Sequence, residues 1–190
     1  MRALLYFDLG SPYAYLAAER APEVLGVVPE LRPVLLGAVF ARRGFGSWSA
    51  TPGRGKRMAE IEARAERYGL PPLRWPVRWP ADGLAAMRAA VWAEREGRLG
   101  AFARAVFRAQ FAQGGDIGEL GLLAACAQEA GLPGGELAEA IGRAEIKQEL
   151  RDRTDAAWQA GVRGVPTIAV GSSIFYGDDE LERAAALLAA

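Results

Sequence analysis

The chain of 190 residues contains no histidine, no asparagine and one cysteine, and these absences remove whole classes of chemistry. Without histidine, a Ser-His-Asp triad, a Cys-His pair and a zinc site of the Cys/His type are all excluded. The lone Cys126 allows no disulfide within the chain and no Cys-x-x-Cys motif. It lies in an apolar helical run, where we expect a buried structural thiol. Any chemistry must therefore use serine, tyrosine, carboxylates, arginine or lysine, or come from a bound molecule.

The charge balance gives no electrostatic reason to expect a nucleic-acid or membrane partner. The chain has 23 basic and 23 acidic residues, so its formal net charge is zero. No apolar stretch approaches the roughly 20 residues that span a bilayer. The first residues form a β-like segment rather than a basic region followed by an apolar one, as a secretory leader would. We therefore expect a cytoplasmic protein.

The most informative segment is Asp8-Leu9-Gly10-Ser11-Pro12-Tyr13. A short β-like run, 3–7, precedes it and an apolar helical pattern over 12–25 follows it. Serine is favoured at a helix N-cap and proline at the first helical position, which predicts Ser11 as the cap. The unpaired N–H groups and the positive end of the helix dipole then favour an anion beside Ser11. Ser11 as a cap with no other role is the alternative.

A second informative segment, Gly164-Val165-Pro166-Thr167, begins the last part of the chain. Two β-like runs joined by a Gly-Ser turn follow it, and a helix over 181–188 comes last. This order looks like the cis-proline loop of thioredoxin folds, which lies against the helix N-terminus that carries the reactive group. Redox proteins of that type have cysteine where this chain has Ser11. We therefore predict a cis Val165–Pro166 bond close to Ser11; an ordinary trans proline at a strand start is the alternative.

Between these two segments the chain has mainly helical patterns. A strand is expected over 31–36, and a proline- and tryptophan-rich link lies near 70–80. Helices are expected over 59–68, 84–96, 99–112, 117–130, 135–141 and 144–160. A βαβ unit and a ββα unit separated by a helical block define an α/β protein, a thioredoxin fold with a large all-helical insertion. The expected division is a thioredoxin-like domain of residues 1–40 and 161–190 and a helical insertion domain of residues 41–160.

Five segments in chain order resemble the 2-hydroxychromene-2-carboxylate isomerase family. They are residues 6–16, 32–40, 107–117, 161–167 and 175–181. That family is related to kappa-class glutathione transferases and to DsbA-like thioredoxin-fold proteins. The resemblance implies a homodimeric isomerase of aromatic-compound catabolism that uses glutathione, or another small thiol, on a small aromatic acid. No metal is implied.

The same resemblance implies roles for particular residues. Ser11 would hold the sulfur of glutathione as the catalytic residue, and the chain shows no evident base that would make it a nucleophile. The backbone of Val165, beside Pro166, would pair with the cysteinyl unit. A hydroxyl and helix N–H groups favour a thiolate over a thiol on physical grounds as well.

The two ends of the thiol would need charged partners. Asp178 and Asp179 would receive the γ-glutamyl amino group, although acidic residues also stabilise any helix start. Lys56 or Arg54 would hold the glycyl carboxylate, with a solvated loop charge as the alternative. This chain has Ala50 where the family usually has asparagine, and the spacing from Lys56 to the next glycine is shorter than usual. Both departures fall on the glycyl side of the site.

The substrate pocket is expected between Ser11 and the helical insertion, where aromatic residues could form walls or only core. The candidate walls are Tyr13, Phe40, Trp48, Trp75 and Trp79. Two other functions remain open. One is a kappa-class-like glutathione transferase that acts on electrophiles. The other is a module that binds a thiol or a protein without turnover.

Overall fold

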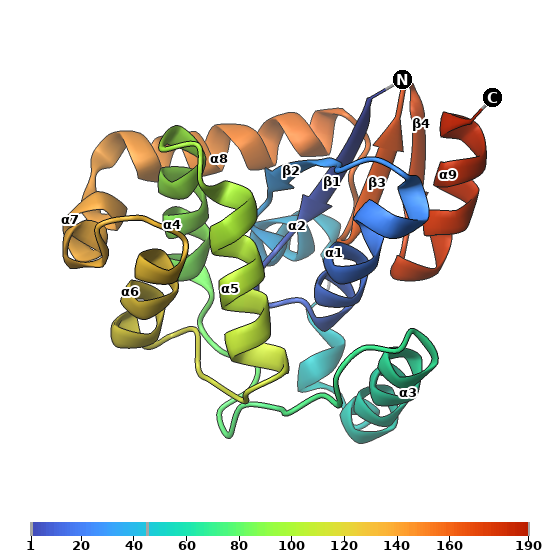
Figure 1. Ribbon diagram of the computed structural model, residues 1–190, viewed down its shortest axis with the longest axis horizontal. Coiled ribbons are helices and arrows are strands. Elements are labelled where there is room, and N and C mark those ends of the chain that lie inside the picture. Colours follow the sequence, from blue (N-terminus) through green and yellow to red (C-terminus); the bar gives the residue numbers. More distant parts are fainter. Residues whose placement is uncertain (1, 45, 190) are drawn as a thin grey trace.

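The computed structural model describes residues 2–44 and 46–189. Its sheet has four strands in the order β2-β1-β3-β4 (Figure 1). They are β1 (Ala3–Phe7), β2 (Glu30–Pro33), β3 (Thr167–Val170) and β4 (Ser173–Tyr176). β2 pairs parallel with β1, whereas β3 is antiparallel to both β1 and β4. The first and last parts of the chain therefore meet in the centre of one sheet, as a thioredoxin fold requires.

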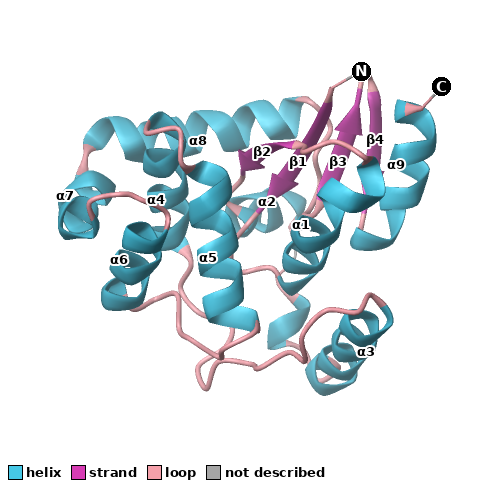
Figure 2. Cartoon of the chain, in the orientation of Figure 1, coloured by secondary structure: helices cyan, strands magenta, loops and turns pink. Residues whose placement is uncertain are grey.

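The remaining described elements are helices. They are α1 (Pro12–Leu25), α2 (Leu36–Arg43), α3 (Arg54–Arg67), α4 (Leu84–Arg95), α5 (Leu99–Phe111), α6 (Leu120–Glu129), α7 (Leu137–Gly142), α8 (Ala144–Gln159) and α9 (Leu181–Leu188), with 3-10 turns η1 (Trp48–Ala50), η2 (Gly134–Glu136) and η3 (Asp178–Glu180). Figure 2 shows α4 to α7 gathered at one side of the molecule, with α8 running from them to the sheet. None of the described helices is long and apolar enough to cross a membrane.

The strand expected over 31–36 was wrong in its second half. β2 ends at Pro33, which is opposite Phe7, the last residue of β1. A strand beyond that point would have no partner, and Leu36 instead begins α2. Three helix starts also differ, since α3 begins at Arg54 rather than 59, α6 at Leu120 rather than 117 and α7 at Leu137 rather than 135. Short apolar runs do not separate strand from helix by periodicity alone.

Three apolar clusters hold these layers together. Leu5, Ile168 and Leu181 belong to the cluster that joins the sheet to α1 and α9. Val39 and Val165 belong to the cluster between α2, α8 and the loop before β3. The largest cluster fills the helical block and reaches Phe7 and Leu9 at the end of β1. The turn from β1 to α1 is thus anchored in the core, which positions Ser11.

Candidate functional site

A polar cavity of about 490 Å³ collects five of the six residues that were expected to bind a thiol cofactor. It is lined by Lys56, Val165, Pro166, Asp178 and Asp179, together with Tyr13, Gly53, Arg57, Glu60, Arg64, Tyr176 and Gly177. Most of these residues come from α3, from the loop before β3 and from the entrance to α9, whereas Tyr13 belongs to α1 and Tyr176 to β4. Residues more than a hundred positions apart therefore face one space.

Ser11 lines a second, aromatic cavity of about 280 Å³. Of the five aromatic residues proposed as walls, Phe40, Trp48 and Trp79 line it. Tyr13 lines the polar cavity instead, and Trp75 stands against Trp79 with ring centroids 4.7 Å apart. Three of the five aromatic residues proposed as walls thus line one cavity with Ser11.

The two cavities adjoin each other. The Tyr13 ring, on the polar cavity, meets the Trp48 ring, on the aromatic cavity, with centroids 6.2 Å apart. The Arg57 guanidinium also lies 5.8 Å from the Trp48 ring centroid. Ser11 and Tyr13, which are two residues apart in the chain, thus line neighbouring cavities.

Ser11 caps α1 as its sequence predicts. Its backbone is extended, and its Oγ accepts a hydrogen bond from the Ala14 N–H at 3.2 Å. Pro12 is the first residue of the helix. Because Oγ accepts that bond, the hydroxyl proton can still be donated to an anion in the cavity. The cap and an anion-binding role are therefore compatible at this residue.

Asp8 is a candidate that sequence reasoning missed. It lines the cavity of Ser11, is buried, and its two carboxylate oxygens accept hydrogen bonds from the Gly10 and Leu36 N–H groups, both at 2.8 Å. Burial raises the pKa of this carboxyl to about 6, although the two N–H groups oppose that shift. The sequence showed no base near Ser11, whereas the structure places a proton-exchanging group in the same cavity. An acidic residue directly after a buried strand was the signal.

Asp178 is already engaged by side chains at the end of α3. Its Oδ1 accepts a bond from Arg64 at 2.9 Å and its Oδ2 accepts one from the Tyr68 hydroxyl at 3.0 Å. Burial raises the pKa of the Asp178 carboxyl, and the charge of Arg64 opposes that shift. Asp179 is exposed and lies 3.4 Å from Arg64. Since each carboxylate oxygen can accept two bonds, this pair can still receive an ammonium group.

The cations at the cavity differ in their placement. Lys56 lines the polar cavity, whereas the Arg54 guanidinium lies over the Trp79 ring, with its Cζ 5.4 Å from the ring centroid. Arg57 also lines the polar cavity and was missed by the sequence reasoning, which considered only its neighbours. Lys56 and Arg57, but not Arg54, thus line the polar cavity.

The loop before β3 presents its backbone to the polar cavity. The Val165–Pro166 bond is cis, as expected from the sequence. The Pro166 carbonyl accepts a bond from the Gly177 N–H at 3.1 Å, which holds this loop beside η3. Within the described residues, no hydrogen bond engages the Val165 backbone. That backbone can therefore pair with an extended ligand.

A buried donor in the aromatic cavity also lacks a partner. Among the described residues, nothing accepts a hydrogen bond from the Trp79 indole N–H, which is buried. Buried donors are nearly always paired in native proteins. An acceptor atom supplied by a ligand would satisfy it. Together with the Val165 backbone and the cations of the polar cavity, this N–H is a group that can bind acceptor atoms of a ligand.

Comparison with known proteins identifies the family to which this chain belongs. Residues 4–189 match the model of the DSBA-like thioredoxin domain, so the chain belongs to that family. Within it, the chain is 30% identical to the 2-hydroxychromene-2-carboxylate isomerase of Sphingobium xenophagum, over 93% of this chain and 92% of that protein.

Two further relatives agree with this placement. The chain is 27% identical to glutathione S-transferase kappa 1 of Homo sapiens, over 97% of this chain and 89% of that protein. A solved 2-hydroxychromene-2-carboxylate isomerase has the same fold, with a TM-score of 0.88 at 21% identity, covering 100% of this chain and 95% of that one. The fold expected from the sequence is therefore confirmed.

Proposed function

We propose that this protein is a glutathione-dependent isomerase of the 2-hydroxychromene-2-carboxylate isomerase type. The observation that carries the proposal is the pair of adjoining cavities at the start of α1. One has the charged groups that a γ-glutamyl tripeptide needs, and the other has Ser11 and aromatic walls. The proposal also includes a role in aromatic-compound catabolism, a cytoplasmic location and a homodimer.

In this proposal the polar cavity holds the tripeptide by its ends and its middle. Asp178 and Asp179 receive the γ-glutamyl ammonium group, and Lys56 with Arg57 receives the glycyl carboxylate. The Val165 backbone, beside Pro166, pairs with the cysteinyl unit in a short β-like contact. When bound, the thiolate supplies the nucleophile for reversible addition to a conjugated aromatic acid, with rotation and elimination completing the isomerisation.

The residues of the chain provide the environment for this chemistry. The Ser11 hydroxyl and the first N–H groups of α1 stabilise a thiolate, lowering a thiol pKa that is about 8.5 in water. Trp48, Trp79 and Phe40 enclose the aromatic ring and exclude water from it. Asp8 can hold or release a proton close to neutral pH, because burial places its pKa at about 6.

A second candidate function is a kappa-class-like glutathione transferase. The identity of 27% with glutathione S-transferase kappa 1 supports it, and the same two cavities would serve. Here the electrophile would occupy the aromatic cavity and remain bonded to the sulfur. A module that binds a thiol or a protein without turnover uses the same polar cavity and is the third possibility.

Glutathione titration in thermal unfolding is the first test. A ligand that binds only the folded state raises stability by RT ln(1 + [L]/Kd), so millimolar glutathione should raise the melting temperature. Incubation with a hydroxychromene acid and with a chromophoric electrophile, each with and without glutathione, then separates the three functions. Isomerisation of the acid only with glutathione supports the proposal. No thermal shift at millimolar glutathione would contradict both enzyme functions in their glutathione form.

The variant Ser11→Ala tests the central residue. The lost cap should cost about 0.5–2 kcal/mol of stability, so the protein should fold. Turnover should fall by about a hundredfold, the order found for removing one preorganised donor to an anion. Ser172→Ala, in the exposed turn between β3 and β4, is the matched control and should retain full turnover. Turnover in folded Ser11→Ala equal to wild type would reduce Ser11 to a cap.

A further inference from the structure

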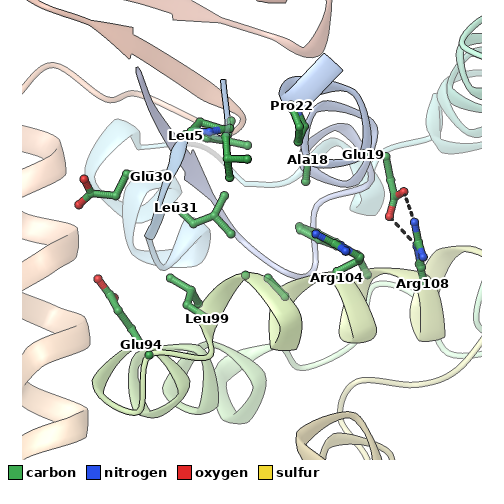
Figure 3. Close-up of a pocket in the computed structure, with 16 residues that line it drawn as sticks. Leu5, Ala18, Glu19, Pro22, Glu30, Leu31, Glu94, Leu99, Arg104 and Arg108 are labelled. Carbon is green, nitrogen blue, oxygen red and sulfur yellow. Dashed lines mark hydrogen bonds and ion pairs between the residues drawn. The ribbon is translucent and has the colours of Figure 1, made fainter. Parts of the chain in front are cut away.

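A third cavity lies away from both parts of the candidate site. Its volume is about 470 Å³, and it is enclosed by α1, the segment leading into β2, and the α4–α5 region (Figure 3). Ala18 of α1 lines it, about 10 Å along the helix axis from Ser11 at 1.5 Å per residue. Its volume falls within the range of small-molecule pockets.

The floor of this cavity is apolar. Leu5 and Leu31 contribute from two adjacent strands, and Leu99 and Phe107 contribute from α5. Val28, which is 83% exposed, stands at its rim. Such a surface favours an apolar ligand body, because burial of apolar area is the main favourable term in binding.

Two arginines line the cavity, and only Arg108 is paired within the described part of the chain. Each rim carboxylate is paired: Glu19 with Arg108, Glu94 with Arg153, and Glu30 with Arg2 and Arg32. Arg104, on α5, makes no hydrogen bond or ion pair with any residue of the described ranges. Figure 3 shows its side chain extending from α5 toward Ala18 of α1, across the cavity.

We propose that this cavity binds an amphipathic monocarboxylate, with the apolar body on the leucine and phenylalanine floor and the carboxylate on Arg104. A planar guanidinium offers a bidentate pair of donors that matches a carboxylate. The ligand needs only one anionic group, because the other arginine that lines the cavity, Arg108, is already paired with Glu19. The proposal uses no residue of the thiol site, so it does not depend on the proposed function.

Two variants test the positive charge of Arg104 and the volume of the cavity separately. Arg104→Gln removes the cation and keeps a long polar side chain. Gly100→Leu fills the cavity from α5, where an added Cβ would meet no atom within 4 Å. Leucine is a better helix former than glycine, so this variant should fold at least as well as wild type. Arg67→Gln, an exposed arginine of α3 away from the cavity, is the control for a lost positive charge.

The test measures binding of octanoate and of the uncharged octan-1-ol by isothermal titration calorimetry, in the presence of saturating glutathione. We expect wild type and Arg67→Gln to bind the acid equally. Arg104→Gln should bind it about tenfold or more weakly, Gly100→Leu should not bind it, and the alcohol should bind wild type about tenfold or more weakly.

Three results would overturn the proposal. One is no binding of the acid to wild type. The second is equal binding by wild type and Arg104→Gln or Gly100→Leu. The third is a wild-type dimer that Gly100→Leu converts to a monomer, because the cavity would then be covered by a second copy of the chain. Sedimentation velocity of both proteins provides that last readout.

Discussion

Replacing Asp8 with asparagine should change how the stability of this protein depends on pH. Burial raises the pKa of the Asp8 carboxyl from 3.8 to about 6 in the folded protein, and unfolding returns it to about 3.9. The folded state therefore binds this proton more tightly than the unfolded state does. The resulting stabilisation is fully present below about pH 4 and is lost as pH rises through about 6.

The size of the effect follows from the pKa difference. A shift of about two units corresponds to about 3 kcal/mol at 1.36 kcal/mol per unit. The asparagine side chain carries no charge at any pH, but its amide nitrogen cannot accept one of the two N–H bonds that Asp8 accepts from Gly10 and Leu36. That loss costs about 1–3 kcal/mol at all pH values. Asp8→Asn should thus be less stable than wild type at pH 4 and close to wild type at pH 7.

Urea unfolding at pH 4, 5, 6 and 7 measures this directly. The difference in unfolding free energy between wild type and Asp8→Asn should change by about 3 kcal/mol across the series. Asp82→Asn removes an exposed carboxylate from the same cavity and separates the effect of burial from that of one lost negative charge. A wild-type to Asp8→Asn difference that is constant from pH 4 to 7 would refute the reasoning.

Three further predictions concern the thiol site and the single cysteine. Cys126 is buried, and burial raises the pKa of its thiol to about 11. A disulfide reagent such as 5,5′-dithiobis(2-nitrobenzoate) should therefore not react with the native protein at pH 7, but should react fully in urea. Prompt reaction of the native protein would contradict the burial of Cys126. Against that unreactive background, Ser11→Cys should add one reactive thiol, with a pKa below 8.5, that forms a mixed disulfide with glutathione. An added thiol that titrates like free cysteine would exclude an anion site at this helix end. Lys56→Gln should raise the Kd for glutathione about tenfold without changing the melting temperature of the unliganded protein. Lys147→Gln, the control, changes the only other lysine of the sequence and should leave that Kd unchanged.

Local signals were read correctly from the sequence because they act on their own neighbours. The cap at Ser11 with Pro12 at the first helical position depends on a few adjacent backbone groups. The last helix, 181–188, has the bounds expected from its apolar spacing. The order of proline loop, hairpin and helix, together with the five resembling segments, was sufficient for the fold.

The error at β2 shows where local reasoning stops. Leu36 belongs to an apolar run that reads equally well as strand or helix, and the end of β1 decides which it is. β1 itself ends at Phe7, and the Leu36 N–H instead donates to Asp8. A side chain 28 positions earlier therefore helps to begin α2.

The contacts of Asp178 were equally beyond the sequence. Arg64 and Tyr68 reach it from α3 and its C-terminal end, more than a hundred residues earlier in the chain. Nothing in the local pattern of α3 distinguishes Arg64 from the other arginines of that helix. Only packing of α3 beside the entrance to α9 selects it.

The sequence by itself determined the fold, the serine at the start of α1 and the absence of histidine and Cys-x-x-Cys chemistry, since each depends on residue identity and short-range order. The tertiary structure decided that Ser11 and the expected thiol-binding residues lie in two adjoining cavities, that Asp8 shares the cavity of Ser11, and that Lys56 rather than Arg54 lines the polar cavity. The physical reason is that a pKa, a cavity or a charge pair depends on groups brought together from distant parts of the chain, and residue spacing does not encode that proximity.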